Sequence, residues 1–141
     1  MRRAGLIIAM ALLAGCETMQ AGGGVSNAHS AAPIDLGDWR HATAAATMTT
    51  FEGIVHSRYP AGSSIAAAAS DLQHNEFNCA VNHDASTRGE PPAQICRRTV
   101  AAENCTNTWQ VHLFGAGDAL TRARPLYDRR CGGDGLLGGP G

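Results

Sequence analysis

The chain of 141 residues contains no lysine, so all eleven of its positively charged side chains are arginines. Its formal net charge is only −1, which argues against a generally basic nucleic-acid-binding protein but leaves room for a local basic patch. A long apolar run is also missing, because the run at residues 4–14 is too short to cross a membrane as a lasting helix. Since 44% of the residues are apolar, the chain can still build a core, which excludes wholesale disorder.

Motifs for metal binding and redox chemistry are missing as well. The cysteines and histidines contain no Cys-x-x-Cys or His-x-x-x-His pair, the close spacing that lets a short turn direct two ligands at one ion. The spacing of Cys79, His83, Cys96 and Cys105 therefore favours disulfides over a metal site, and it argues against thiol–disulfide exchange chemistry. The sequence predicts no metal and no cofactor.

No catalytic constellation stands out. Ser63-Ser64 lacks the G-x-S-x-G surroundings of a hydrolase nucleophile and suits a helix cap instead. His112 falls on the polar face of a predicted strand, where solvent exposure explains it, and its candidate acid–base partners, Asp84 and Glu103, belong to no motif. We therefore expect a protein that is not an enzyme.

The N-terminal residues have the pattern of an export signal. Met1-Arg2-Arg3 is a positive n-region, and the apolar run after it is typical of a secretory signal peptide. This run ends in Leu13-Ala14-Gly15-Cys16, which resembles the lipobox of bacterial lipoproteins. The resemblance implies a signal peptide over 1–15, cleaved before a Cys16 that is diacylated and N-acylated. The alternatives are an ordinary signal peptide with a chance cysteine and an uncleaved anchor helix, which the polar residues after Cys16 disfavour.

A lipidated Cys16 would hold the protein at the membrane, because buried acyl chains contribute about 0.8 kcal/mol per CH₂ and more than one chain makes attachment stable. The second residue of the mature chain is Glu17, where an aspartate retains enteric lipoproteins at the inner membrane. The resemblance therefore implies an anchor in the outer membrane, with the domain facing the periplasm.

Cleavage also changes the charge and the cysteine count. Loss of Arg2 and Arg3 leaves nine arginines against twelve acidic residues, a formal charge of −3. An even number of cysteines in an oxidising compartment predicts two disulfides. The four that remain are Cys79, Cys96, Cys105 and Cys131.

The mature chain divides by composition into three parts. Residues 16–33 are mostly small or polar, which is typical of a flexible tether. Residues 132–141 are rich in glycine and are expected to form a disordered tail. A single domain is therefore expected over residues 34–131, a size at which one core is adequate.

Two helices are expected at the start of this domain. Asp38 suits the N-cap of a helix that begins at Trp39, although β-branched threonines weaken the apolar pattern. Ser63 or Ser64 caps a second helix, which carries an apolar stripe and ends at Asn75 in the left-handed conformation.

Alternation of apolar and polar residues then predicts four strands, over 77–82, 95–101, 109–114 and 120–127. Gly115-Ala116-Gly117-Asp118 is the expected loop of the last hairpin, and Pro125 confines the fourth strand to a sheet edge. The prediction is an α+β fold in which both helices pack on one face of a small antiparallel meander.

This meander favours one pairing of the cysteines. The first hairpin brings Cys79 near Cys96, and the next brings Cys105 toward Cys131. The pairing of Cys96 with Cys105 and of Cys79 with Cys131 is also compatible with hairpins, so the sequence leaves both open.

Six of the nine arginines of the mature chain lie on or just beyond the second and fourth predicted strands. They are Arg97, Arg98, Arg122, Arg124, Arg129 and Arg130. Together with the acidic residues between them, they give residues 97–130 a formal charge of +3, which could meet lipid headgroups or an acidic protein surface. The alternative is edge protection, in which charges on an exposed strand discourage edge-to-edge pairing.

Residues 59–79 (YPAGSSIAAAASDLQHNEFNC) resemble the small envelope lipoproteins of the BamE/OmlA type, in which a glycine-led helix with an apolar stripe enters a short antiparallel sheet. The chain has Asn75-Glu76-Phe77 where Gly-Phe is expected, and its four cysteines are additional. The resemblance implies an architecture and carries no activity.

Taken together, these patterns predict a lipid-anchored, non-enzymatic protein that binds an envelope protein partner through a small domain and binds no nucleic acid. The alternative is a periplasmic inhibitor or immunity protein that blocks a hydrolase or toxin with the polar loop at 83–92.

Overall fold

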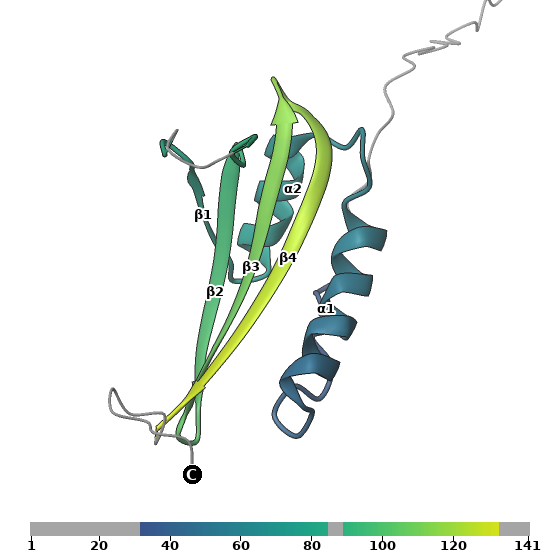
Figure 1. The fold of residues 1–141 in the computed structure, drawn as a ribbon. Helices are drawn as coiled ribbons and strands as arrows, with labels where there is room; N and C mark the ends of the chain where they lie inside the picture. The colour runs from purple at the N-terminus through teal and green to yellow at the C-terminus, as the bar shows by residue number, and fades with distance from the viewer. Residues whose placement is uncertain (1–31, 85–88, 133–141) are drawn as a thin grey trace, which may run out of the picture.

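The computed structural model describes residues 32–84 and 89–132, which form two helices and one antiparallel sheet (Figure 1). The sheet order is β1-β2-β3-β4, so every strand pairs with its neighbour in sequence, and both helices lie against the same face. The predicted α+β meander is confirmed. The elements are α1 (Ala44–Arg58), α2 (Ile65–His74), β1 (Asn78–Val81), β2 (Gln94–Ala102), β3 (Cys105–Ala116) and β4 (Ala119–Cys131).

Helix α1 begins five residues later than the sequence predicts. The backbone carbonyl of Asp38 accepts hydrogen bonds from the N–H groups of His41 and Ala42, and this turn takes the place of a helical start at Trp39. The N-cap is Thr43, whose hydroxyl oxygen accepts a bond of 3.1 Å from the N–H of Ala46. The prediction of an Asp38 cap was therefore wrong.

Helix α2 is capped as predicted at its N-terminus but not at its C-terminus. The Ser64 hydroxyl oxygen accepts from the N–H of Ala67, while the Asp118 carboxylate accepts from the Ser64 hydroxyl and from the N–H of Ala66. These hydrogen bonds lower the pKa of Asp118. At the other end the left-handed residue is Glu76, with φ of 67°, whereas Asn75 has φ of −99°. The left-handed assignment of Asn75 was wrong.

Glu76 ends the helix in the geometry of a Schellman motif. The N–H of Phe77 donates to the carbonyl of Leu72, and the N–H of Glu76 donates to that of Gln73. The side chain of Asn75 is engaged elsewhere, because its amide donates to the Asp71 carbonyl and its oxygen accepts from the N–H of Ile34. It thereby ties the segment before α1 to the end of α2.

All four predicted strands are present, and the last three are longer than predicted. The expected hairpin loop at 115–118 was too long, because Gly115 pairs with Leu120 and Ala116 with Ala119, so only Gly117 and Asp118 form the turn. Strand β4 lies at a sheet edge, as its proline predicts.

A bulge lies in this last hairpin next to Gly115. Phe114 pairs with Arg122 and Gly115 with Leu120, so Thr121 is the extra residue of β4, and its hydroxyl donates to the Phe114 carbonyl. A Cβ atom at position 115 would lie 2.0 Å from the Ala119 carbonyl oxygen. Position 115 therefore requires glycine, because the backbone of Ala119 approaches it too closely for a Cβ atom.

Two glycine-to-alanine changes should have opposite effects on stability. Gly115→Ala forces the hairpin backbone apart and should lower the free energy of unfolding by about 1–3 kcal/mol, as overpacking does. Gly53→Ala, on the exposed side of α1 with nothing within 4 Å of the new Cβ, should raise it by about 0.4–1 kcal/mol. Urea unfolding followed by tryptophan fluorescence measures both, and equal effects of the two variants would contradict the close approach.

The disulfides join neighbouring strands in the preferred pairing. Cys79–Cys96 links β1 to β2 and Cys105–Cys131 links β3 to β4, each between residues that are direct partners in the strand register. Cys79, Cys96 and Cys105, which the metal alternative would use as thiolate ligands, are thus all engaged in disulfides.

Candidate partner-binding surface

Alternation along the strands gives the sheet a covered face and an open face. Cys96 of β2 and Val111 of β3 are direct partners and are fully buried beneath the helices. Their sequence neighbours point the opposite way, so Arg97, Gln110 and His112 lie on the face that the described helices leave uncovered (Figure 1). The core therefore fills one side of the sheet only.

This alternation splits the six arginines between the two faces. Arg98 and Arg129 lie on the covered face, where Arg98 forms an ion pair with Glu76 at the end of α2. The other four, Arg97, Arg122, Arg124 and Arg130, lie on the open face. The predicted basic region is thus not one surface.

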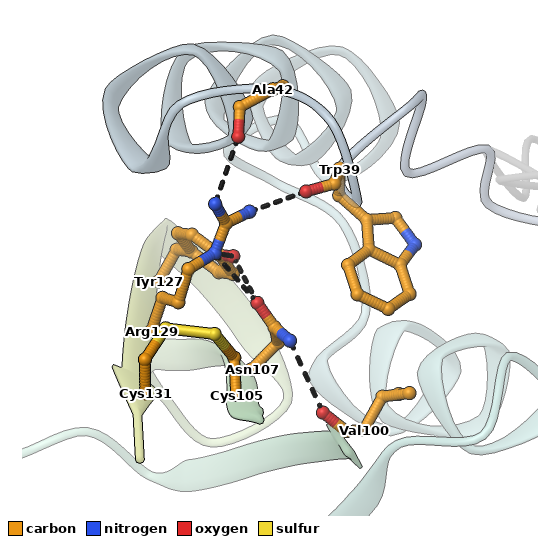
Figure 2. Close-up of a disulfide and its surroundings, with 8 residues drawn as sticks. All are labelled: Trp39, Ala42, Val100, Cys105, Asn107, Tyr127, Arg129 and Cys131. Carbon is orange, nitrogen blue, oxygen red and sulfur yellow. Dashed lines mark hydrogen bonds between the residues drawn. A yellow bond between two sulfur atoms is a disulfide. The ribbon is translucent and has the colours of Figure 1, made fainter. Parts of the chain in front are cut away.

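Arg129 is a structural residue, which corrects its assignment to a partner-binding surface. Figure 2 shows its guanidinium reaching the segment before α1, where it donates to the backbone carbonyls of Trp39 and Ala42. Its Nε donates to Asn107 Oδ1 at 3.0 Å, and the Tyr127 hydroxyl donates to the same oxygen at 2.6 Å. Arg129 therefore fixes the turn at 38–42 to the sheet, beside the Cys105–Cys131 disulfide.

A second buried polar cluster was not predicted. The Asp71 carboxylate accepts hydrogen bonds from Arg58 Nε at 2.6 Å, from Arg58 Nη2 at 2.8 Å and from the Tyr59 hydroxyl at 2.6 Å. Hydrogen bonding to Asp71 raises the pKa of Arg58, and burial together with the Asp71 hydrogen bond raises that of Tyr59. This cluster joins the end of α1 to α2. Its sequence signal is the position of Asp71, three residues after Ala68 on the apolar side of α2.

On the open face, three arginines surround His112 and Phe114, and we call Arg97, Arg122 and Arg124 the basic strip. Arg124 is the direct partner of His112, and Arg122 is the direct partner of Phe114. Among the described residues, neither Arg97 nor Arg124 has an ion-pair partner, whereas the carboxylate nearest to Arg122 is 4.0 Å away, on Glu90. Arg130 stands apart from the strip and pairs with Asp128 at 2.8 Å.

His112 is more enclosed than the sequence suggested. It is half-buried, and its Nε2 lies 3.3 Å from Gln110 Oε1. Burial, followed by the positive charges of Arg124 and Arg97, lowers the pKa of His112. This shift favours the neutral ring, so the positive charge of this surface comes from the arginines.

Two residues of the basic strip, Arg122 and Arg124, line a cavity of about 370 Å³ on the open face, together with Gly89, Glu90 and Pro92. Its apolar wall includes Ile95 and Phe114, and its charged rim includes Arg122 and Arg124. Phe114 is only 3% exposed although it faces away from the helices, because the Arg122 guanidinium lies 3.9 Å above the centre of its ring. The open face thus carries its own small apolar site.

The candidate acid–base residues do not come together as a group. Asp84 lines the same cavity as His112, whereas Glu103 lies in the turn between β2 and β3 and lines a separate cavity together with Trp39. Ser64 caps α2 as predicted, and the Ser63 hydroxyl donates to the Pro60 carbonyl. Within residues 32–84 and 89–132, no three His, Cys, Asp or Glu side chains are grouped as a metal site would require.

Several predicted features lie outside the described residues. They are the signal peptide at 1–15, the lipidation site at Cys16, most of the tether at 16–33 and all but the first residue of the tail at 132–141. In the part of the chain that is described, neither helix has the length and apolar character needed to span a membrane.

Known proteins offer no guide to the open face, so its role has to be argued from its own chemistry. Comparisons of the chain with protein-family models, with curated proteins and with solved structures find no match.

Proposed function

We propose that this protein is a lipid-anchored component of the bacterial cell envelope whose domain binds a protein partner through the open face of its sheet. One observation carries the binding role: helices cover one face, while the other presents the basic strip, of which Arg122 and Arg124 line a cavity. Two disulfides hold the strands that carry these side chains. A surface fixed in this way loses little conformational freedom on binding.

The anchoring role is supported by the lipobox-like Leu13-Ala14-Gly15-Cys16 and by the two disulfides, which are typical of oxidising compartments. Glu17 favours the outer membrane over the inner membrane, as the resemblance to bacterial lipoproteins implies. The domain then faces the periplasm, where envelope proteins are within reach.

Replacement of Cys16 by serine should release the protein from the membrane. Serine offers no thiol for acylation, so the acyl chains that hold the protein are lost. Membrane fractionation should find the variant in the soluble periplasmic fraction, and mass spectrometry should show the loss of the lipid mass. Thr18→Ser is the matched control and should stay in the membrane fraction, whereas an unchanged distribution of Cys16→Ser would contradict the anchor.

The binding role is tested by site-specific photo-crosslinking of the full chain in the cells that make it. A photoreactive residue at Thr99, exposed on the open face, should give an adduct with another protein. The same residue at Glu52, exposed on α1, should give far less. Adducts from position 52 alone would contradict binding through the sheet.

Inhibition of an enzyme is a second candidate, favoured by one feature of the same surface. Glu90 and Pro92, from the loop that the sequence suggested as a blocking element, line the cavity on the open face. An inhibitor would therefore use both the loop and the sheet. The cross-linked protein distinguishes the two roles, because a hydrolase or toxin whose activity falls when this protein is added would establish inhibition.

A further inference from the structure

We propose that the basic strip binds an acidic loop of the protein partner, with one carboxylate of that loop held between Arg97 and Arg124. This inference rests on the proposed binding role and specifies the chemistry of the partner. It follows from three features of the open face: two guanidinium groups that have no ion-pair partner among the described residues, an apolar recess beside them, and carboxylates that lie beside the other two arginines of this face.

The first feature is the pair of arginines on either side of His112. Arg97 and Arg124 are exposed, and among the described residues neither is in an ion pair. Arg97 makes one long hydrogen bond, of 3.4 Å, to Gln110. A guanidinium group presents a planar fork of donors that matches a carboxylate, so both side chains retain donors for one. Both also act electrostatically on His112, which places their charges around the same point of the sheet.

The second feature is the recess beside these charges. Phe114 and Ile95 provide an apolar wall, and Arg122 stacks over the Phe114 ring. The methylene groups of an acidic side chain, or an apolar neighbour in the same loop, can pack against this wall. The carboxylate of the loop can then contact the arginines at the rim of the recess. This combination favours a protein loop over an isolated anion.

The third feature is the position of the acidic residues. Glu90 lies 4.0 Å from Arg122, and Asp128 lies 2.8 Å from Arg130. Of the four arginines on this face, Arg97 and Arg124 are therefore the two without an ion-pair partner among the described residues, so an incoming carboxylate is directed to them. A flat anionic membrane would meet the acidic and basic residues together, and three arginines are too few to hold a nucleic acid against physiological salt.

The experiment extends the crosslinking from Thr99. In the wild-type chain, the partner peptide joined to position 99 should be rich in Asp or Glu. The double variant Arg97→Gln/Arg124→Gln should reduce the yield of this adduct at least tenfold, because it removes both carboxylate ligands. Arg130→Gln is the matched control, since Arg130 lies exposed on the same face but is paired with Asp128. Its adduct yield should be unchanged.

The outcomes separate this inference from the proposed function. If the double variant keeps its adduct, or if the joined peptide is neutral or basic, the open face binds a partner but the acidic-loop inference is wrong. Adducts to lipid or to a second copy of this chain also overturn it. Absence of any adduct in the wild type overturns the binding role itself. The replaced side chains are exposed, so all variants should have the same urea midpoint of unfolding. Equal midpoints exclude misfolding as the cause of a lower adduct yield.

Discussion

Replacement of Asp71 by alanine should lower the free energy of unfolding by about 3–5 kcal/mol, the usual cost of removing one partner of a buried ion pair. The Arg58 and Asp71 side chains are only 12% and 9% exposed, so water cannot take the place of the lost carboxylate. The variant also removes the acceptor of the Tyr59 hydroxyl, which is buried with it. Urea unfolding, followed through the two tryptophans, measures the change.

Two control variants separate the lost charge from lost packing. Arg58→Met/Asp71→Leu removes both charges and fills the space with apolar atoms, so it should recover most of the stability that Asp71→Ala loses. Arg130→Gln breaks an exposed ion pair and should change the free energy of unfolding by less than about 1 kcal/mol. A loss of the same small size in Asp71→Ala would show that the buried pair contributes no more than the exposed one.

The parts of the fold that the sequence predicts are those governed by local pattern. Ser64 precedes an apolar stripe and caps α2, and alternation around Trp109 marks the strand at the centre of the core. The start of α1 escaped prediction because a contact with β4 fixes it. Arg129 binds the carbonyls of Trp39 and Ala42 from about ninety residues away, and no local pattern reports such a bond.

The candidate site was predictable as a set of residues but not as a surface. Adjacent residues of a strand face opposite sides, so Arg97 and Arg98 had to separate, as had Arg129 and Arg130. Which member of each pair faces the helices depends on the register, and the buried positions of β3 set that register. The lowered pKa of His112 was beyond sequence reasoning, because its burial and its neighbour Arg124 both result from strand pairing.

Reduction of both disulfides should have the largest effect of all, a loss of about 6 kcal/mol in the free energy of unfolding. Each bond closes a loop, of 17 and 26 residues in sequence separation, and the chain-entropy model gives about 3 kcal/mol for a loop of either length. The two loops do not overlap in sequence, so each restricts a different part of the unfolded chain and the contributions add. A domain of this size has about 5–15 kcal/mol in total.

Urea unfolding with and without dithiothreitol tests this, and single-bond variants assign the two shares. Cys105→Ser/Cys131→Ser and Cys79→Ala/Cys96→Ala should each lose about half of the total, the second pair being changed to alanine because Cys96 is fully buried. Equal midpoints for the oxidised and reduced chain would contradict the assignment. A loss of this size would be a large fraction of the total stability, so the reduced domain should unfold at a much lower urea concentration than the oxidised one.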